Sequence, residues 1–517
     1  MADFWDIDTD ERNFETGSSE FGGSQEVDVV VIGGGGAGLA AAVRAAEAGA
    51  KQVVLLEKNK KLGGCTKIAM GVFAVESSAQ KRQGIHHTID ECFTRHMYIS
   101  NWSCDSRLVR RWMRESGKVM DWLEGYGVEF DEVGTCSGPI QTYHMSHHRT
   151  GLEIVNRLTD ACVTYGVKVL TGTRAKKLLT DRNGEITGVM AQKGEAEINI
   201  RTKSVILATG SLAANQELVK RFFPGRGYEN AKIMAAMPFS TGDGFLMAEE
   251  AGAMAGRVSP NYIGPHNHPR NVLIGCLLRR PHMMIVNKNG ERYINEDLYG
   301  QGEFGWMSGK ALEEQPFHIC YPMMDEACFR DMIANKECAN EVEGNQSRHS
   351  AETGLLMEEV DPCAWLDSVE KYMPREVEDG MMKICGSLEE AAQWIGCDVD
   401  TLSETVERYN GFCDDGRDDD FLKNPKYMYP LKTPPFYVFK GLHGIDNFIG
   451  GIKVNDRLEV LNSEFKPIPG LYAAGIATSG WLGQGYGHAG TEMGLTTFSG
   501  YSAGYAAGEY AVKAGQN

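Results

Sequence analysis

Three glycines near the start of the chain give the clearest sign of chemistry. Gly33, Gly35 and Gly38 follow an apolar, β-branched segment, Val27–Ile32, and open an alanine-rich segment. Between a strand and a helix, this spacing lets the first glycine make a tight turn, the second approach a pyrophosphate and the third pack the helix near the sheet. The helix N-terminus then faces the phosphates. Glu57, at the end of the next apolar strand, is placed to bind a ribose hydroxyl. The pattern predicts a nucleotide-binding βαβ unit.

The chain as a whole is long and acidic. Its 517 residues exceed the roughly 250–300 at which a single core stops growing, so we expect two domains. A net charge of −18 argues against a nucleic-acid binder. No segment resembles a membrane span or a secretory signal. The 13 cysteines, without CxxC or zinc spacing, fit a reducing compartment. We expect a cytoplasmic protein with neither nucleic acid nor membrane insertion.

Composition divides the chain into four segments. Residues 1–25 have the character of a flexible acidic leader, and residues 26–244 carry the glycine motif. Residues 245–435 are richer in Met, Cys, Trp and acidic side chains and poorer in Gly, which is typical of an inserted domain. Residues 436–517 return to a glycine-rich composition. Residues 26–244 and residues 436–517 are therefore expected to form one domain.

Several further motifs accompany the glycine turn. They are Glu57, Gly63–Gly64, Ala208–Gly210, Thr241–Gly244, Met284–Glu296, Gly450–Gly451 and Pro469–Gly475. With this set, the chain resembles the fumarate reductase/succinate dehydrogenase flavoprotein family over residues 26–514. The resemblance implies an α/β fold: a Rossmann-like FAD-binding domain, split in sequence, with an inserted α+β capping domain. It also implies hydride transfer between the flavin and a substrate carbon, with a protein acid or base at the adjacent carbon.

The resemblance also assigns residues to the cofactor. No histidine occupies the loop that carries covalent flavin in succinate dehydrogenases, so we expect non-covalent FAD. Ile476 stands where the family usually has Glu or Asn, so one polar contact is expected to be lost. The expected FAD contacts are Gly33, Gly35, Gly36, Ala37, Gly38, Glu57, Lys58, Gly63, Gly64, Thr66, Ala208, Thr209, Gly210, Asp243, Gly475, Gly490 and Leu495.

Departures from the fumarate reductases bear on the substrate. The cap-domain arginine that donates a proton in those enzymes is replaced by Gly300, with Tyr299 beside it. Tyr486 aligns with the arginine that clamps a substrate carboxylate, and the segment Asp446–Gly451 lacks the family histidine before its glycine pair. Arg279 matches another family arginine, so some cationic character remains. Because a dicarboxylate needs cationic clamps, we do not expect fumarate or succinate as substrate.

The C-terminal segment is more similar to the 3-ketosteroid dehydrogenases of the same family. In those enzymes a Tyr hydroxyl and a Gly N–H four residues later bind the 3-keto oxygen, and the corresponding residues are Tyr486 and Gly490. Negative charge builds on that oxygen during the reaction, and one preorganised donor contributes about 3 kcal/mol. Tyr299 lies within one residue of their cap-domain tyrosine. We predict Tyr299, Tyr486 and Gly490 as catalytic, and Arg279 and His488 as substrate-binding.

Each of these residues also has a structural interpretation. The alternative for Tyr486 is a packed aromatic, and the alternative for Tyr299 is a tyrosine of a hinge loop in the cap. His488 and Glu492 suit hydrogen-bonded core positions. The histidine-rich segment HMSHHR, residues 144–149, has no acidic partner at a metal-ligand spacing, so we expect no metal.

The leading hypothesis is an FAD-dependent oxidoreductase acting on a C=C or CH–CH bond next to a ketone. Its expected substrate is a 3-ketosteroid or a similar apolar cyclic enone. A first alternative is a reductase of an unsaturated acid, such as an acrylate or aryl-acrylate, that uses Arg279. A second is a flavin-binding subunit without a substrate site. Because haem, iron–sulfur and second nucleotide motifs are missing, we expect a separate electron donor, either a carrier protein or NAD(P)H.

Overall fold

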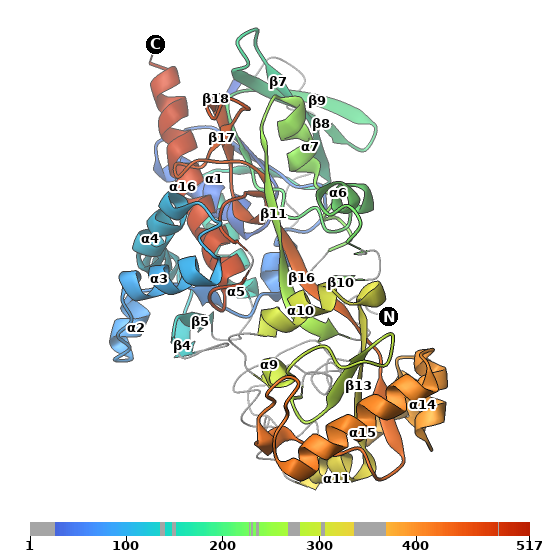
Figure 1. The fold of residues 1–517 in the computed structure, drawn as a ribbon. Coiled ribbons are helices and arrows are strands. Elements are labelled where there is room, and N and C mark those ends of the chain that lie inside the picture. The colour runs from blue at the N-terminus through green and yellow to red at the C-terminus, as the bar shows by residue number, and fades with distance from the viewer. Residues whose placement is uncertain are drawn as a thin grey trace.

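A computed structural model describes residues 26–134, 140–146, 151–226, 228, 231–233, 237–266, 280–300, 305–334, 369–483 and 485–516. These residues form two regions, which lie one above the other in Figure 1. The upper region holds an eight-stranded sheet, and much of a seven-stranded sheet lies in the lower region. Two long paired strands, β11 (Ala255–His266) and β16 (Gly441–Ile452), extend from one region toward the other.

The eight-stranded sheet is built on the predicted βαβ unit. β1 (Glu26–Ile32) pairs in parallel with β2 (Val53–Leu56) on one side and with β9 (Ala196–Leu207) on the other. The strand order is β17–β18–β9–β1–β2–β6, which adds β6 (Lys168–Leu170), β17 (Glu459–Leu461) and β18 (Pro467–Ala473). Because β18, β9, β1, β2 and β6 are parallel, their carboxyl ends share one edge of the sheet. The glycine turn after β1 lies at this edge, where α/β proteins bind ligands.

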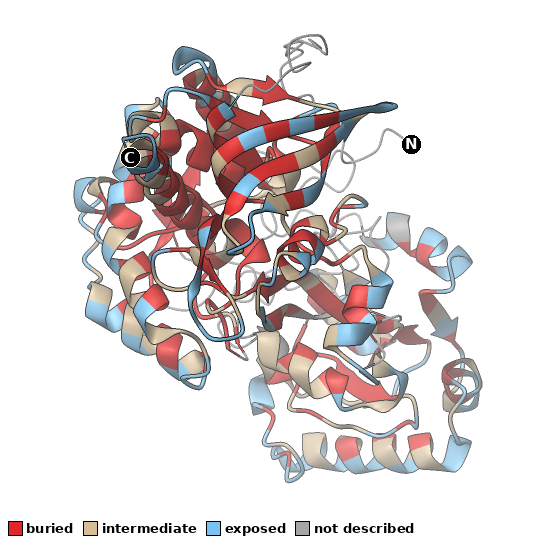
Figure 2. Cartoon of the chain, turned by 90° about the horizontal axis from the view of Figure 1, so that it is seen from above, coloured by how far each residue is buried: buried red, intermediate tan, exposed pale blue. Residues whose placement is uncertain are grey.

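An antiparallel ribbon extends this sheet. β7 (Thr173–Thr180) and β8 (Ile186–Lys193) pair with each other, and β8 pairs with β9. Buried and exposed residues alternate along the first half of β9, whereas Val205–Leu207 are all buried (Figure 2). Alternation is typical of a sheet with one wet face, and continuous burial is typical of a strand covered on both faces. β9 therefore passes from a solvent-facing ribbon into the core.

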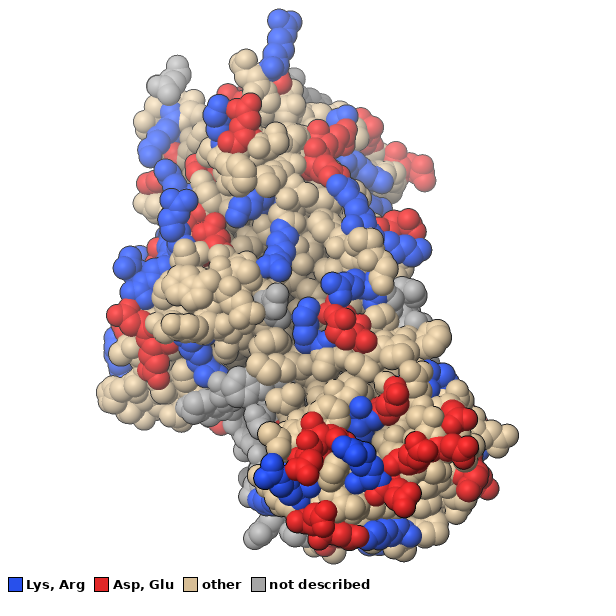
Figure 3. Space-filling view, viewed as in Figure 1, with Lys and Arg blue, Asp and Glu red and all other residues tan. Residues whose placement is uncertain are grey.

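The seven-stranded sheet has the order β10–β16–β13–β15–β14, with β11 on β16 and β12 on β13. The remaining strands are β10 (Lys232–Ile233), β12 (Met284–Asn287), β13 (Ile319–Asp325), β14 (Met382–Cys385) and β15 (Phe436–Phe439). The apolar faces of α14 (Leu388–Ile395) and α15 (Val399–Asp415) pack against β12 and β15. Figure 3 shows acidic and basic side chains interspersed on the outside of this lower region.

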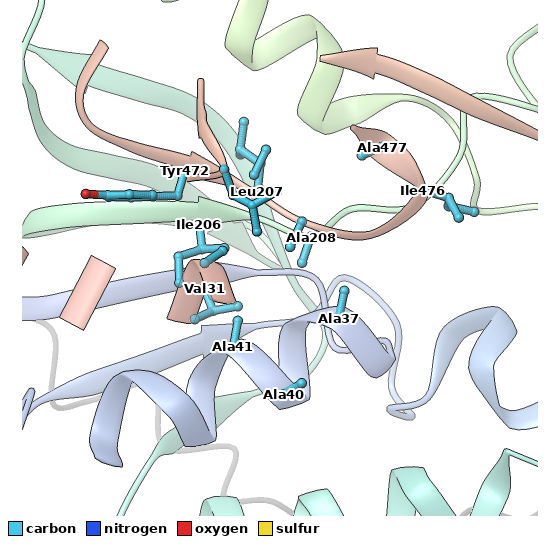
Figure 4. Packing of buried hydrophobic residues seen from close by; sticks show 14 of the residues in the cluster. Val31, Ala37, Ala40, Ala41, Ile206, Leu207, Ala208, Tyr472, Ile476 and Ala477 are labelled. Carbon is cyan, nitrogen blue, oxygen red and sulfur yellow. The ribbon is translucent and has the colours of Figure 1, made fainter. Parts of the chain in front are cut away.

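Helix α1 (Gly36–Glu47) packs closely against α16 (Thr491–Ala514). A Cβ at Gly500 would lie 2.3 Å from the Ala37 carbonyl oxygen, and one at Gly504 would lie 2.3 Å from that of Ala41. The four-residue spacing places these residues on facing sides of the two helices, so only glycine permits the approach. Figure 4 shows Ala41 beside Val31 of β1, where the other face of α1 covers the sheet. The packing holds α1 and its N-terminus against the parallel strands.

The fold expected from the sequence is confirmed as α/β with a parallel sheet and an inserted region. Strands of the second sheet come from residues 232–452, a span wider than the expected insertion at 245–435. The division into domains at those residues stays a prediction. Residues 1–25 lie outside the described ranges. Among the described helices, none combines the length and the apolar composition that crossing a membrane requires.

Candidate active site

The turn between β1 and α1 leaves no room for side chains at two of its glycines. Gly33 has a φ of +112°, and a Cβ there would lie 2.3 Å from the Ala208 carbonyl oxygen at the end of β9. A Cβ at Gly38 would lie 1.8 Å from the Gly33 carbonyl oxygen. These obstacles are backbone atoms, which cannot rotate away as a side chain does. Both positions therefore require glycine.

The N-terminus of α1 is suited to an anion. Its N-cap, Gly35, provides no capping side chain, and the first turn contains no acidic residue. Thr66 Oγ1 accepts the Gly36 N–H at 3.1 Å, and the Gly63 N–H donates to the Gly34 carbonyl at 2.8 Å. The loop that carries Gly63 and Thr66 therefore lies against the turn. A helix N-terminus with backbone donors and no competing carboxylate favours a phosphate group.

Glu57 stands at the end of β2, beside the same turn. Its carboxylate accepts hydrogen bonds from the Gly34 N–H and the Asn59 N–H, both at 2.7 Å. Burial raises the pKa of this carboxyl, although both backbone bonds oppose the rise. The position is the one from which a carboxylate accepts ribose hydroxyls in dinucleotide-binding folds.

Lys58, which follows Glu57 in the chain, belongs to a group of charged residues. Lys58 Nζ donates to Thr241 Oγ1 at 2.8 Å and to Asp243 Oδ2 at 3.0 Å. Arg174 contacts both oxygens of Asp243, at 2.9 and 3.1 Å. Burial alone would raise the pKa of Asp243, but the bonds from Arg174, Thr241 and Lys58 lower it. Tertiary structure thus joins Lys58 and Asp243, two predicted cofactor residues from distant segments.

A buried hydroxyl next to the turn is left without a partner. Thr209 follows Ala208 directly, and its Oγ1 forms no hydrogen bond within the described residues. A Cβ at Gly244 would lie 2.1 Å from this oxygen, so glycine is required beside it. Buried polar atoms are normally satisfied, and an orphaned one fits a site that a ligand completes. Together with the glycine turn, the open helix N-terminus and Glu57, this hydroxyl fits a bound FAD.

A second polar group lies at the N-terminus of α16. The Tyr486 hydroxyl accepts a hydrogen bond from the Glu492 N–H at 3.0 Å. The Glu492 carboxyl accepts one from Asn261 Nδ2 at 2.9 Å, and the same nitrogen lies 3.3 Å from Asp446 Oδ2. Asn261 belongs to β11 and Asp446 to β16. The paired long strands of the second sheet therefore supply one side of this group, and the C-terminal segment supplies the other.

Desolvation controls the protonation of this second group. Burial raises the pKa of Glu492, and the neighbouring Asp446 raises it further. Burial likewise raises the pKa of Asp446. The pKa of Tyr486 is raised well above its ordinary value by burial and by Glu492, so its hydroxyl keeps its proton at neutral pH. The group holds protons and is poorly suited to binding an anion.

Gly490 forms the N-cap of α16 with a φ of +73°. A Cβ there would lie 2.6 Å from the Phe73 backbone nitrogen and 2.9 Å from Tyr143 Cδ2. The Gly490 carbonyl also accepts the Phe73 N–H at 3.0 Å. Glycine is therefore required here by conformation and by space. Tyr486 bonds to the first turn of the same helix, so the two predicted oxyanion donors lie at one helix end.

Other predicted site residues are placed differently. His488 is buried, its Nε2 lies 2.9 Å from the Cys92 carbonyl oxygen, and burial lowers its pKa to about 3. Tyr299 lies in α9 (Asp297–Gly300), but its side chain is not among the described ones. Arg279 lies outside the described residues. The roles assigned to these three residues stay predictions.

Of the histidines in HMSHHR, only His144 lies within the described residues. It is buried, its Nε2 lies 2.6 Å from Ser77 Oγ, and its Nδ1 lies 3.1 Å from the Thr142 carbonyl oxygen. Both ring nitrogens are thus occupied by protein partners. No group of three or more possible metal ligands occurs in the part of the chain that the structure describes.

Sequence reasoning missed Asn261 and Asp446 as site residues. Asp446 begins the DNFIGG segment, residues 446–451. The signal that could have found it was an acidic residue close to the position where the family has a histidine. Asn261 carried no signal, because it lies 185 residues from Asp446 and 231 from Glu492 in sequence. Only the fold brings β11 beside β16 and beside the N-terminus of α16.

The glycine turn, the parallel sheet and a set of polar groups that fits FAD together define a dinucleotide-binding flavoprotein. The chain matches the family model for the FAD binding domain over residues 28–492, and it belongs to that family. It is 29% identical to vinyl phenol reductase of Lactiplantibacillus plantarum over an alignment of 498 positions, which covers 93% of this chain and 96% of that protein. It is also 29% identical to urocanate reductase of Eggerthella lenta, over 88% of this chain and 70% of that protein.

Solved structures share the fold. The open conformation of a flavocytochrome c3 fumarate reductase superposes with a TM-score of 0.70 at 26% identity, covering 95% of this chain and 79% of that one. A 3-ketosteroid-Δ4-(5α)-dehydrogenase from Rhodococcus jostii superposes with a TM-score of 0.68 at 24% identity, covering 95% and 99%. The expected similarity to the fumarate reductases is confirmed. This protein is an FAD-dependent oxidoreductase acting on C=C or CH–CH bonds.

Proposed function

We propose that this protein reduces a C=C bond conjugated to an uncharged oxygen function, with a cyclic enone such as a 3-ketosteroid as its substrate. The Tyr486 hydroxyl carries the proposal. It accepts the Glu492 N–H, so its own proton is left for another acceptor, and none takes it within the described residues. A substrate carbonyl oxygen is such an acceptor. Hydride addition to an enone places negative charge on that oxygen, where a fixed donor stabilises it.

The N-terminus of α16 supports the same role. Gly490 begins this helix of 24 residues, and no acceptor for the Gly490 N–H occurs in the described part of the chain. The helix dipole adds partial positive charge at this end. Tyr486 and Gly490 therefore offer two donors to one oxygen. Bound FAD would supply the hydride chemistry, and the glycine turn, Glu57 and the Thr209 region would hold it.

The surrounding charges favour an uncharged substrate. Asp446 and Glu492 lie beside Tyr486, where a carboxylate clamp would need cations. In the described ranges, neither carboxyl is paired with a Lys or an Arg. A substrate carboxylate would meet like charge or compete for the protons of these groups. Tyr486 therefore favours a ketone over the unsaturated acids of the first alternative.

A vinyl phenol is the second candidate substrate. The relative from Lactiplantibacillus plantarum, which matches over nearly its whole length, is a vinyl phenol reductase. A phenol is also an uncharged oxygen function conjugated to a C=C bond, and a hydrogen-bonding hydroxyl with neighbouring carboxyls suits it. An acid reductase stays the rival, and it would need Arg279 together with another cation.

The test is an anaerobic reoxidation experiment on the purified holoprotein. Its flavin is reduced, then mixed separately with 3-ketosteroid enones, 4-vinylphenol, fumarate and an aryl-acrylate, and the flavin absorbance is followed. We expect fast reoxidation by the uncharged compounds. Reoxidation by the acids alone, together with its loss in Arg279→Ala, would establish the rival function.

Tyr486→Phe tests the oxygen donor. Loss of one such donor lowers kcat by about 10²–10³-fold, and we expect the unfolding midpoint to change little. Tyr228→Phe is the matched control, because that hydroxyl is bonded to Glu313 and Tyr262, away from α16. An unchanged kcat in Tyr486→Phe would remove the basis of the proposal.

Three further expectations belong to the proposal. FAD is held non-covalently, so denaturation should release all of the flavin into the soluble fraction. Electrons come from a separate donor, which reduction assays with NADH, NADPH and carrier proteins would identify. The region between residues 245 and 435 acts as the cap over the flavin.

A further inference from the structure

Asp446 and Glu492 form an unusual pair of carboxyl groups. A single donor, Asn261 Nδ2, bridges them at 3.3 and 2.9 Å. Both residues are half-buried, yet desolvation is the largest influence on the pKa of each. Two neighbouring carboxylates without a cation cannot both ionise near neutral pH. The pair therefore retains a proton.

A second side chain points to a ligand at this place. Asn447 is fully buried and lies near enough to the Glu492 carboxyl to lower its pKa. Its Nδ2 is directed at that carboxyl but has no acceptor within ordinary hydrogen-bond distance among the described residues. Its Oδ1 accepts the Phe448 N–H at 3.0 Å, which fixes the direction of the amide. An amide donor held without a partner beside a carboxyl pair fits a site completed by an oxygen atom.

We propose that Asp446 and Glu492 share one proton and act as the acid–base pair for the substrate oxygen held by Tyr486. This inference rests on the proposed function and narrows it to substrates whose oxygen takes up or gives up a proton. It adds two catalytic residues to Tyr486 and Gly490. The corresponding clamp of a dicarboxylate reductase would be cationic, so the pair also determines specificity against anions.

The step balances in the reducing direction. The β-carbon receives a hydride, which reduced FAD would supply when bound and which brings two electrons, and the C=C π electrons move toward the oxygen. The carboxyl pair gives its proton to that oxygen, forming an enol O–H bond, and is reprotonated from water. Transfer of a proton to the α-carbon, with loss of the enol proton, completes the CH–CH bond. Oxidation follows the same steps in reverse.

The neighbouring titratable groups do not compete for this proton. Tyr486 and Cys65 face the pair, and Tyr143 faces Tyr486. Burial and the two carboxyls raise the pKa of Cys65 to about 12. The pKa of Tyr486 is also raised well above its ordinary value, chiefly by burial. The carboxyl pair is therefore the group of this cluster that changes protonation closest to neutral pH.

The test combines infrared spectra with pH profiles of the holoprotein. Infrared difference spectra in H₂O and D₂O should show a protonated carboxyl band that Glu492→Gln and Asp446→Asn each alter. The kcat for the uncharged substrate should fall as pH rises and the pair loses its proton. Glu492→Gln should lower kcat by about 10²-fold, the typical contribution of an acid–base group, and abolish this alkaline fall. Asp446→Asn should move the fall to lower pH, because Asp446 raises the pKa of Glu492.

Glu313→Gln is the control, because this buried carboxyl accepts hydrogen bonds from two tyrosines and lies outside the cluster. It should leave the alkaline fall in place. A profile unchanged in Glu492→Gln, with turnover intact, would overturn the acid–base role and leave the proposed function standing. If no uncharged substrate reacts with the wild-type protein at any pH, the proposed function fails first. A missing carboxyl band in the wild-type spectrum would overturn the shared proton independently of turnover.

Discussion

Two clusters of carboxyl groups in this protein differ in whether cations compensate them. In the lower region, Arg292 contacts Glu296 and Asp418, each at 2.8 Å, and both carboxylate side chains are fully buried. Lys423, also fully buried, lies 3.6 Å from Glu296. At the N-terminus of α16, Asp446 and Glu492 share an amide donor and have no cation among the described residues.

The difference separates a charge-compensated cluster from an uncompensated one, to which we assign the proposed proton transfer. Arg292 and Lys423 compensate the charges of Glu296 and Asp418, and Lys423 Nζ also donates to the Met283 carbonyl at 2.9 Å. A satisfied network of this kind fixes the positions of β12 and the segment around Asp418. An uncompensated pair stabilises nothing by its charge. Such perturbed groups are typical of sites where protons move.

The largest expected effect is on the compensated cluster. Arg292→Ala leaves two buried carboxylates without their main cation, which typically costs about 3–5 kcal/mol of unfolding free energy. Denaturant unfolding of the holoprotein, followed by circular dichroism, measures it. Glu492→Gln, which removes an uncompensated carboxyl, should not destabilise the protein at neutral pH. Equal destabilisation by the two variants would erase the distinction between the clusters.

The two clusters should also respond oppositely to pH. Burial would raise the pKa of Asp418, but the hydrogen bond and the charge of Arg292 lower it. The ionised Asp418 therefore stabilises the folded protein above the ordinary carboxyl pKa. This contribution is lost when the pH falls through the lowered pKa. The pKa of Glu492 is raised, so the folded protein binds more protons than the unfolded chain between the ordinary and the raised values. Stability therefore falls with rising pH across that window.

Variants can assign these two pH dependences. Asp418→Asn should flatten the acid side of the unfolding free energy profile, and Glu492→Gln should flatten the side from weakly acid to alkaline pH. Measurements at matched ionic strength are needed, because net charge changes with pH. The comparison fails if Glu492→Gln steepens the loss of stability at alkaline pH.

The smallest expected effect concerns an exposed ion pair in the same lower region. Arg408 of α15 contacts both oxygens of Asp420, and the Arg408 side chain is mostly exposed. Exposed pairs contribute about 0–1 kcal/mol. Arg408→Ala should therefore change the unfolding free energy by less than about 1 kcal/mol. A loss as large as that of Arg292→Ala would show that burial does not distinguish the two arginines.

Local motifs predicted the strands and the helix around the glycine turn, and the cofactor contacts assigned to them stay predictions. The strands β1 and β2, the glycine turn and the place of Glu57 follow from apolar runs and glycine spacing, which act over about 30 residues. The same reasoning reached Lys58 and Asp243 as separate residues. It gave no sign that Arg174 joins them, because that contact links β7 to the start of α7 (Asp243–Glu250), and the two residues are 69 apart in sequence.

A short motif indicates only part of the proposed substrate site. Tyr486 and Gly490 lie within four residues of each other, so a short motif pointed to both. Asn261 and Asp446 lie on the paired strands β11 and β16, although they are 185 residues apart in sequence. Pairing between such distant segments leaves no short-range pattern in the sequence. Residue type alone also does not show that Glu296 is paired with cations and that Glu492 has none among the described residues.

The sequence by itself determined the βαβ unit, the glycine turn and the family, because these depend on local conformation and on side chains that cannot fit. Tertiary structure decided which carboxyl groups are compensated. Glu296 has Arg292 four residues before it, but it also needs Lys423 and the Asp418 segment beside it. Glu492 meets Asp446 across the β16–α16 contact, where no described cation reaches it. The charge state of a carboxyl depends on everything packed around it, and that environment exists only in the folded chain.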